Sequence, residues 1–180
     1  MGLPQPLIDA LREVEQAEKF NPEEAIREGT EASIRQMVGD FRGLLVDLEK
    51  SAEGIESSGQ AVLQKVEREI SLGSVSQDLD DVIEWLLSQE QARRGQLPHR
   101  LDLVQRLRAE TFSSRMSASD KARLLSACDR FLKAIQGILE TLRDLRWSLM
   151  ALRAEAEDPG DAPVFDNPQD LLDYLKTPSR

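Results

Sequence analysis

The sequence predicts an all-α protein: an elongated helical bundle with two long heptad-patterned helices and shorter helices between them. Three observations favour this fold. Aromatic residues make up only 4% of the 180 residues and charged residues 31%, a balance typical of long helices and coiled coils. Residues 22–72 and 117–157 each carry apolar residues at alternating steps of four and three. Patterns typical of β-strands are hard to find in the chain.

A short first helix is expected over residues 5–19. Its apolar residues fall on one side of a helix: Leu7, Ile8, Leu11 and Val14. Asn21 is then suited to cap the next helix, because its side chain can accept hydrogen bonds from free backbone N–H groups. Pro22 fits the first helical position and Glu24 completes an arrangement like a capping box, so a second helix is expected to begin here.

The segment 22–72 has an unbroken heptad seam. Its positions are Ile34, Val38, Phe41, Leu45, Leu48, Ala52, Ile55, Gly59, Val62 and Val66. As one helix the segment would be about 75 Å long, at about 1.5 Å per residue. Ser57, Ser58 and Gly59, flanked by Gly54, have low helix propensity and permit a kink or a break into two antiparallel helices. The sequence leaves the single helix and the hairpin as alternatives.

Two shorter helices are expected in the middle of the chain. Gly73 is a C-cap glycine that ends the segment before it, and Ser74 or Ser76 is suited to open a helix. The apolar face of that helix consists of Leu79, Val82, Ile83, Leu86 and Leu87. A turn at residues 94–96 is expected to separate it from another helix over residues 97–112.

The clearest helix of the sequence follows a loop over residues 113–117. Ser117, with Asp120 at the third helical position, is expected to start it, and it runs to Glu157. Its seam consists of Leu124, Cys128, Phe131, Ile135, Ile138, Leu142, Leu145, Leu149, Leu152 and Ala156. A parallel row of Leu125, Leu132 and Leu139 widens the first half of this face, as suits a multi-helix bundle.

The chain is expected to divide into a helical bundle or coiled-coil domain, residues 1–157, and a tail, residues 158–180. The tail consists of a Pro-rich linker and a short acidic amphipathic helix opened by Asn167 and Pro168. About two turns of helix are not stable alone in water, so the tail must dock on its own bundle or on a partner, or remain unfolded. The candidate partner-binding residues are Phe165, Leu171, Leu172, Tyr174 and Leu175.

The formal net charge of −10 disfavours binding to phosphate backbones and anionic lipid, so nucleic acid and membrane surfaces are not expected as partners. No apolar run approaches the roughly 20 residues that span a bilayer. A single cysteine, Cys128, excludes an intramolecular disulfide, and a cytoplasmic location is expected.

One cysteine and one histidine also exclude most zinc sites by number, and neither a metal nor another cofactor is predicted. Cys128 lies between Leu124 and Phe131 in the seam, where a thiol behaves as a small apolar side chain. A structural role is therefore favoured over a Cys128–His99 catalytic dyad.

The six residues 94–99 place a histidine after an arginine with four residues between them. This spacing resembles the motif of HEPN-type ribonucleases, which are all-α, and the resemblance would imply RNA cleavage through Arg94 and His99. The family usually has a polar residue directly after the arginine, where this chain has Gly95, and Pro98 is awkward on a helix. An exposed residue at a helix start is the alternative interpretation of His99.

Carboxylates three residues apart share a helix face and can hold a hard cation. Glu53 with Glu56, and Asp81 with Glu84, have this spacing. It resembles the acidic pairs with which all-α nucleotide pyrophosphohydrolases of the MazG type hold magnesium, although the second pair is in reversed order. The same spacing recurs elsewhere in this acidic chain, so a solvated helix face is the alternative.

Residues 93–115 carry six arginines against two carboxylates, a local charge of +4. This segment could bind RNA, or it could complement the acidic first segment within the molecule or across a dimer. Only Phe112 is available to stack on bases, which favours protein contacts.

These observations predict a non-enzymatic helical protein–protein interaction module, an adaptor or scaffold. It would act through coiled-coil surfaces, including self-association, with the C-terminal helix as a further contact. The alternatives are an antitoxin-type or immunity-type inhibitor of a basic effector, a metal-dependent nucleotide pyrophosphohydrolase and a HEPN-like ribonuclease.

Overall fold

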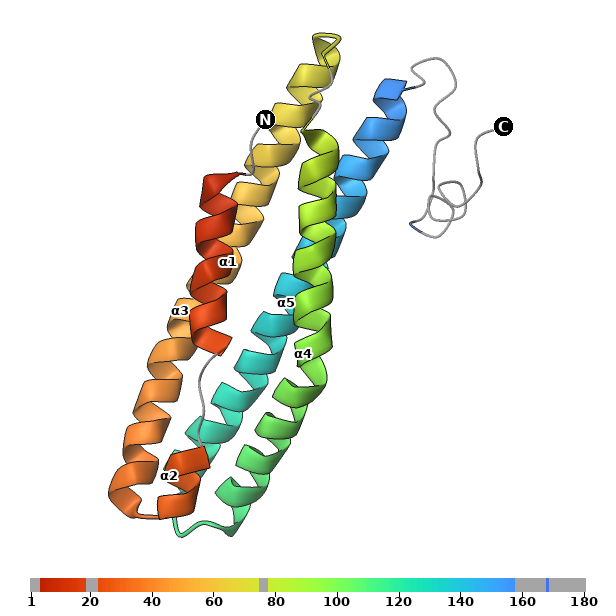
Figure 1. Ribbon diagram of the computed structural model, residues 1–180. Helices are drawn as coiled ribbons and strands as arrows, with labels where there is room; N and C mark the ends of the chain where they lie inside the picture. The colour runs from red at the N-terminus through yellow and green to blue at the C-terminus, as the bar shows by residue number, and fades with distance from the viewer. Residues whose placement is uncertain (1–3, 19–22, 75–77, 158–167, 169–180) are drawn as a thin grey trace.

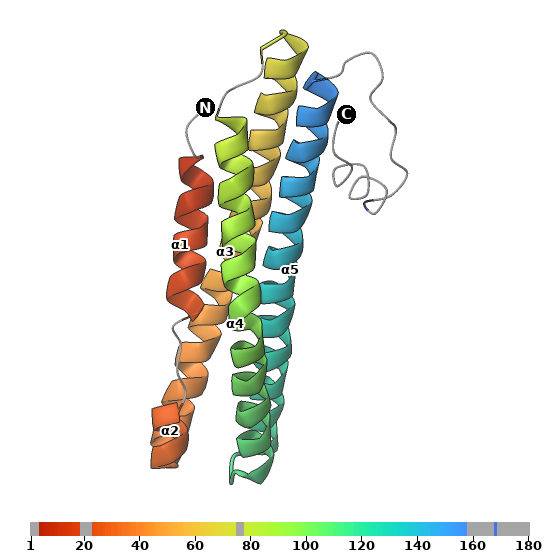
Figure 2. The same ribbon diagram turned by 45° about the vertical axis from the view of Figure 1, so that its right-hand side comes forward.

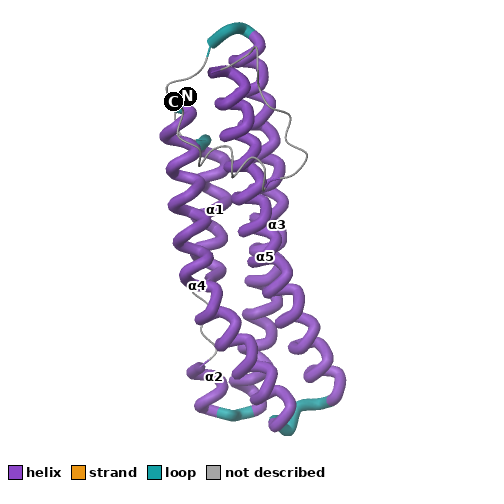
Figure 3. Tube along the Cα trace, turned by 90° about the vertical axis from the view of Figure 1, so that its right-hand side faces the viewer, coloured by secondary structure: helices purple, strands orange, loops and turns teal. Residues whose placement is uncertain are grey.

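The computed structural model describes residues 4–18, 23–74, 78–157 and 168, and its described elements are α-helices. They are α1 (Gln5–Glu18), α2 (Glu23–Glu28), α3 (Glu31–Ser71), α4 (Leu79–Ser113) and α5 (Ala118–Glu157). In Figure 3 the described loop residues between α2 and α3 and between α4 and α5 lie at one end of the molecule, and those that follow α3 lie at the other. The predicted all-α helical bundle is confirmed.

Three long helices, α3, α4 and α5, form the bundle, and α4 runs antiparallel to α3 and α5 (Figure 1). α5 packs against both α3 and α4, and α1 packs along α3. The views in Figures 1 and 2 place α1 beside the middle of α3, and α2 at the end of the bundle where α3 begins. With its 41 residues α3 is about 60 Å long, at about 1.5 Å per residue.

The core follows the two predicted seams. On α3 the buried seam positions are Val38, Phe41, Leu45, Leu48, Ile55, Gly59, Val62 and Val66. On α5 they are Leu124, Cys128, Phe131, Ile135, Ile138, Leu142, Leu145 and Leu149. The rings of Phe41 and Phe131 meet between the two helices with their centroids 5.6 Å apart. Because burying a Leu or Ile side chain contributes about 1.5 to 3 kcal/mol, these positions dominate the stability of the bundle.

The break in the first long segment lies at Gly29, not at residues 57–59. Gly29 has a φ of 63°, which stops α2, and the Thr30 hydroxyl accepts a hydrogen bond from the Ser33 N–H at 3.1 Å to cap α3. The hairpin alternative for residues 22–72 is therefore wrong. Gly59 instead permits close packing of α5, because a Cβ at this position would lie 3.3 Å from Leu145 Cδ2. The predicted caps Asn21 and Pro22 lie outside the described residues.

The predicted turn at residues 94–96 is wrong as well, since α4 continues through Gly95 and Pro98. In place of two shorter helices the chain forms a third long one. A glycine costs an interior helix position about 1 kcal/mol and a proline about 3 kcal/mol relative to alanine. Gly95 and Pro98 are exposed, whereas Leu86 before them and Val104 after them are buried in the core. We infer that packing on both sides of the weak stretch outweighs its low propensity.

Several predicted helix ends are confirmed. α1 ends at Glu18, Gly73 follows α3 with a φ of 75°, and α4 ends at Ser113. α1 also buries Leu7, Leu11 and Val14 of its predicted apolar side. The Ser117 hydroxyl caps α5 by accepting from the Asp120 N–H at 3.1 Å. Ser74 does not open α4, which begins after Asp78, and Ser76 lies outside the described residues.

The predicted tail helix and its candidate residues Phe165, Leu171, Leu172, Tyr174 and Leu175 also lie outside the described residues. Among the helices that are described, none is long and apolar enough to cross a membrane.

Candidate functional site

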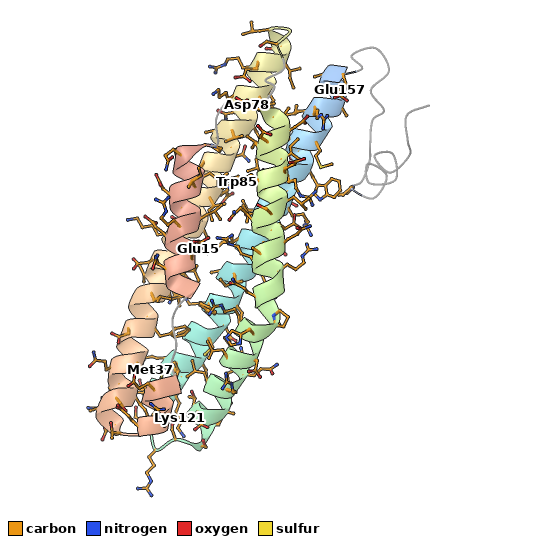
Figure 4. All side chains as sticks on the ribbon, in the orientation of Figure 1. Glu15, Met37, Asp78, Trp85, Lys121 and Glu157 are labelled. Atoms are coloured by element: carbon orange, nitrogen blue, oxygen red, sulfur yellow. The ribbon has the colours of Figure 1, made fainter. Side chains whose placement is uncertain are left out.

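A pocket of about 510 Å³ opens where the start of α3, the end of α4 and the start of α5 meet. We call it the end pocket. It is lined by Gly29, Glu31, Ile34, Arg35, Met37, Leu107, Glu110, Thr111, Ser113, Ser114, Arg115, Met116, Ser117, Asp120 and Leu124. In Figure 4, Met37 and Lys121 mark this end of the bundle, and Asp78 and Glu157 mark the other.

The floor of the end pocket is apolar. Met37, Leu107 and Leu124 are buried, and Ile34 and Met116 are half-buried above them. The two methionines are unbranched and polarizable, so they can adapt to ligand groups of different shape. The floor can therefore receive an apolar side chain.

The rim of the end pocket is charged and exposed. Arg35 and Glu31 form an ion pair at 2.7 Å in which both side chains are largely exposed, and Arg115 and Glu110 are exposed as well. Exposed ion pairs contribute only about 0 to 1 kcal/mol to stability. Arg35 and Glu31 can therefore separate and each bind a ligand group at little cost in free energy.

Phe112 is 69% exposed and follows Thr111 of the pocket lining. Its carbonyl accepts a hydrogen bond from Lys121 Nζ at 3.2 Å, which links the end of α4 to α5. Protein interfaces favour exposed aromatic rings of this kind, because such rings supply a large contact area.

Serines fix the loop that forms one wall of the end pocket. Ser113 and Ser114 donate to the carbonyls of Glu110 and Thr111, at 3.1 and 2.8 Å, and so satisfy the last turn of α4. Ser117 also donates to an Asp120 carboxylate oxygen at 2.8 Å. These short local contacts set the shape of the loop without any long-range partner.

A second polar constellation is buried in the other half of the bundle. Glu90 of α4 is 3% exposed and accepts from Arg94 Nη2 at 2.7 Å and from Arg146 Nε of α5 at 3.0 Å. Arg93 is 4% exposed and donates to the Leu11 carbonyl of α1 at 3.3 Å and to Gln89 Oε1 at 2.9 Å. The layer connects α1, α4 and α5 by compensated charges, which is a structural role.

This buried layer was not predicted from the sequence, although a signal for it exists. Leu86, Glu90, Arg93 and Leu97 continue the steps of four and three that mark the other seams. A seam defined by apolar residues alone does not include Glu90 and Arg93.

Four of the six arginines of residues 93–115 make contacts within the chain: Arg93, Arg94, Arg106 and Arg108. Arg106 pairs with Asp102 on α4 at 3.1 Å, and Arg108 pairs with Asp129 of α5. Arg93 lies 4.0 Å from Glu15 of α1, so this part of the basic segment does face the acidic first segment, as one of the alternatives proposed.

The structure does not bring Arg94 and His99 into a common site. Both are exposed on one continuous helix, five residues and therefore about 140° apart around its axis. The guanidinium of Arg94 is bound to Glu90. The resemblance to the HEPN motif thus gains no support from the geometry.

Cys128 is fully buried on α5, whereas His99 is exposed on α4. Burial raises the pKa of the Cys128 thiol to about 11, against an opposing effect of the nearby Arg108. A reactive cysteine requires the opposite environment, one that stabilises the thiolate. The structural interpretation of Cys128 therefore fits its surroundings.

The acidic pairs Glu53 with Glu56 and Asp81 with Glu84 lie exposed on α3 and α4. Within residues 4–18, 23–74 and 78–157 the structure contains no group of three or more histidine, cysteine, aspartate or glutamate residues that could hold a metal ion. The arrangement resembling pyrophosphohydrolases is thus not assembled in the described part of the chain.

Comparison with known proteins does not assign the chain to a family. No protein-family model, curated protein or solved structure matches it.

Proposed function

We propose that the protein is a helical protein–protein interaction module, an adaptor or scaffold, and that the end pocket receives an apolar side chain from an amphipathic helix of its partner. The observation that carries this proposal is the apolar floor of Met37, Met116 and Leu124. Binding of this kind is dominated by a few apolar anchors that fill pockets, surrounded by polar contacts of small net effect.

The dimensions of the end pocket support an anchor of this kind. About 510 Å³ lies within the range of roughly 300 to 1,000 Å³ that is usual for ligand sites. The walls belong to long helices packed into the core and to a loop with satisfied hydrogen bonds. A preformed site requires little ordering when the partner binds, which favours affinity.

The charge of the chain favours a basic partner. A net charge of −10 creates a field that accelerates association with positively charged proteins. Glu110 and Glu31 on the rim can pair with lysine or arginine residues that flank the anchor, and Arg35 can pair with a carboxylate. An inhibitor of a basic effector is the special case in which binding blocks the activity of the partner.

The test uses photo-crosslinking in the full chain at two exposed positions. A crosslinker at Arg115, which is exposed in the lining of the end pocket, reports on the pocket, and the same group at Val46, 57% exposed on α3, is the control. We expect a crosslinked partner at position 115 and not at position 46. Equal crosslinking at both positions would contradict the assignment, and crosslinks between two copies would identify self-association instead.

Binding of the purified partner then quantifies the site. We expect Met116→Asp and Ile34→Ala to weaken binding about tenfold or more each, the loss typical of a central interface residue, while Val46→Ala leaves it unchanged. Circular dichroism checks that the variants stay folded. An unchanged Kd in both variants would overturn the proposal. So would magnesium-dependent nucleotide hydrolysis that is lost in Glu53→Gln, or RNA cleavage lost in His99→Ala.

A further inference from the structure

Two of the four methionines of the chain line the end pocket. Met37 comes from α3 and Met116 from the loop between α4 and α5. Met150 lies on α5 outside the pocket lining, and Met1 lies outside the described residues. A thioether is an apolar group that peroxides convert into a polar sulfoxide, because oxygen adds to the sulfur. Oxidation can therefore change the polarity of the pocket floor.

The two methionines of the end pocket differ in exposure. Met37 is 6% exposed within the core of the bundle, whereas Met116 is half-buried and packs against the core from outside it. Met116 also lies in the stretch 114–117, which has no helical structure. Susceptibility of a sulfur atom to oxidation follows its exposure. A peroxide that enters the pocket therefore oxidises Met116 before Met37.

The other described sulfur atoms are less reactive. Cys128, the single cysteine, is fully buried, and burial raises the pKa of its thiol to about 11, so that little thiolate exists at neutral pH. The sulfur of Met150 accepts a hydrogen bond from Arg146 Nη1 at 3.6 Å. This donor draws electron density from the sulfur, which then attacks a peroxide more slowly. Met116 is thus the most reactive sulfur of the described residues.

Oxidation of Met116 changes the pocket floor without changing the fold. A sulfoxide oxygen is a strong hydrogen-bond acceptor, and an apolar anchor that covers it would leave this acceptor without a donor. Met116 belongs to neither seam, so the buried positions of α3 and α5 that hold the bundle together are not affected. Loss of binding and loss of folding are therefore separable at this position.

We propose that Met116 is an oxidation site that controls binding of the partner at the end pocket. The Met116 sulfur attacks one oxygen of hydrogen peroxide, the O–O bond breaks as the S–O bond forms, the sulfur loses two electrons and water leaves. The sulfoxide releases the partner. Two thiols, as used by methionine sulfoxide reductases, return the electrons, become a disulfide and remove the oxygen as water. This inference rests on the proposed function, because it concerns the same pocket.

Peptide mass mapping of the full chain after treatment with hydrogen peroxide measures the order of oxidation. We expect the mass of one oxygen atom to be added at Met116 before it is added at Met150 or Met37. Circular dichroism of protein oxidised at Met116 alone should show the thermal transition of the untreated protein. Earlier oxidation of Met37 or Met150 would overturn the proposal, as would unfolding of the protein oxidised at Met116.

Binding of the partner identified by crosslinking at position 115 measures the switch. Oxidation of Met116 should raise the Kd about tenfold or more, the loss typical of a central interface residue, and enzymatic reduction of the sulfoxide should restore it. Met116→Leu keeps an apolar side chain of similar volume, so binding should stay within about twofold and become insensitive to peroxide. Met150→Leu is the matched control and should remain as sensitive as the wild type.

The outcomes distinguish this inference from the proposed function. If the partner crosslinks at position 115 and binds the oxidised protein as tightly as the reduced one, the oxidation switch is wrong and the end pocket remains the binding site. Sensitivity to peroxide that persists in Met116→Leu would assign the effect to another residue and would also overturn the switch. If no partner crosslinks at position 115 in the reduced protein, both proposals are wrong.

Discussion

α4 and α5 are neighbouring helices of similar length, yet they differ in what holds them helical. The buried positions of α5 are apolar, with Cys128 as a small member of the seam. Those of α4 include Glu90, Arg93 and Thr111. The exposed side of α4 also contains Gly95 and Pro98, while Gly137 is the only glycine in α5.

The difference shows two routes to a long helix. α5 has an apolar seam along its length, so its pattern alone specifies both its extent and its buried face. The seam of α4 is interrupted by charged residues, and its exposed side contains Gly95 and Pro98, which disfavour a helix. The continuity of α4 therefore depends on its packing against α5 and α1 and on the partners of its buried charges. Most helices in proteins owe their stability to such packing rather than to propensity.

The largest expected effect follows from a charge placed in the α5 seam. Ile138 is fully buried, and Ile138→Asp would put an unpaired carboxylate where no hydrogen-bond partner replaces water. We expect loss of the cooperative thermal transition, measured by circular dichroism. Gln136→Asp, two residues away on the exposed side, is the control and should melt nearly as the wild type does. A wild-type melting temperature for Ile138→Asp would refute the seam.

A smaller effect is expected when a charge is removed from α4. Glu90→Met would leave the guanidinium of Arg146 buried without its carboxylate, and breaking a buried ion pair typically costs about 3 to 5 kcal/mol. Urea unfolding measures this loss. Glu84→Met removes an exposed carboxylate from the same helix and is the control.

Adding Arg146→Met to Glu90→Met should recover most of the stability, because an apolar pair can replace a buried ion pair. This rescue isolates the buried ion pair, to which α4 contributes Glu90 and α5 contributes Arg146, whereas the seam positions of α5 carry no charge. If the double variant were as unstable as Glu90→Met, the loss would come from packing rather than from an unpaired charge.

The third prediction restores a hydrogen bond to the weak stretch of α4. In Pro98→Ala the new N–H can donate to the Arg94 carbonyl, and we expect a gain of about 1 to 3 kcal/mol in the free energy of unfolding. Gly95→Ala should add less, about 1 kcal/mol, because no side chain or neighbouring backbone atom lies within 4 Å of its added Cβ. Thermal unfolding would show both. A loss of stability in Pro98→Ala would mean that the packing of α4 requires the proline.

The same contrast explains what the sequence could predict. Eight positions of the predicted α5 seam, from Leu124 to Leu149, are buried and the Ser117 cap is present, because local pattern and tertiary packing agree there, whereas Leu152 and Ala156 are only half-buried. The turn at residues 94–96 was wrong because Gly95 and Pro98 are local signals that packing overrides. The break at Gly29 was missed because Asn21, Pro22 and Glu24 predicted a helix start before it, whereas the apolar seam begins only at Ile34.

The end pocket could not be predicted for a different reason. Its residues come from the start of α3, the end of α4 and the start of α5, and they are adjacent only after the helices pair. No local motif marks such a place, because Ile34, Met37 and Leu124 read as ordinary core residues. Phe112 was noted in the sequence only as a ring that could stack on bases, whereas its exposure is a property of the fold.

The smallest expected effect reports how completely the packing around Cys128 of α5 excludes water. Burial raises the pKa of Cys128 to about 11 from an ordinary value of 9.0. The unfolded chain therefore loses this proton at lower pH than the folded protein, and the thiol contributes stability that is present below pH 9 and falls as the pH rises towards 11. At about 1.4 kcal/mol for each pKa unit, the loss should reach about 1 to 2.5 kcal/mol.

Cys128→Ala provides the reference, because it retains the other groups that titrate in this range. The difference in unfolding free energy between wild type and variant should be constant from pH 7 to 8.5 and shrink above pH 9. A constant difference up to pH 11 would mean that the thiolate is as well solvated in the folded state as in the unfolded one. The α5 seam would then admit water at Cys128, and the distinction between an apolar α5 and a polar α4 would not hold there.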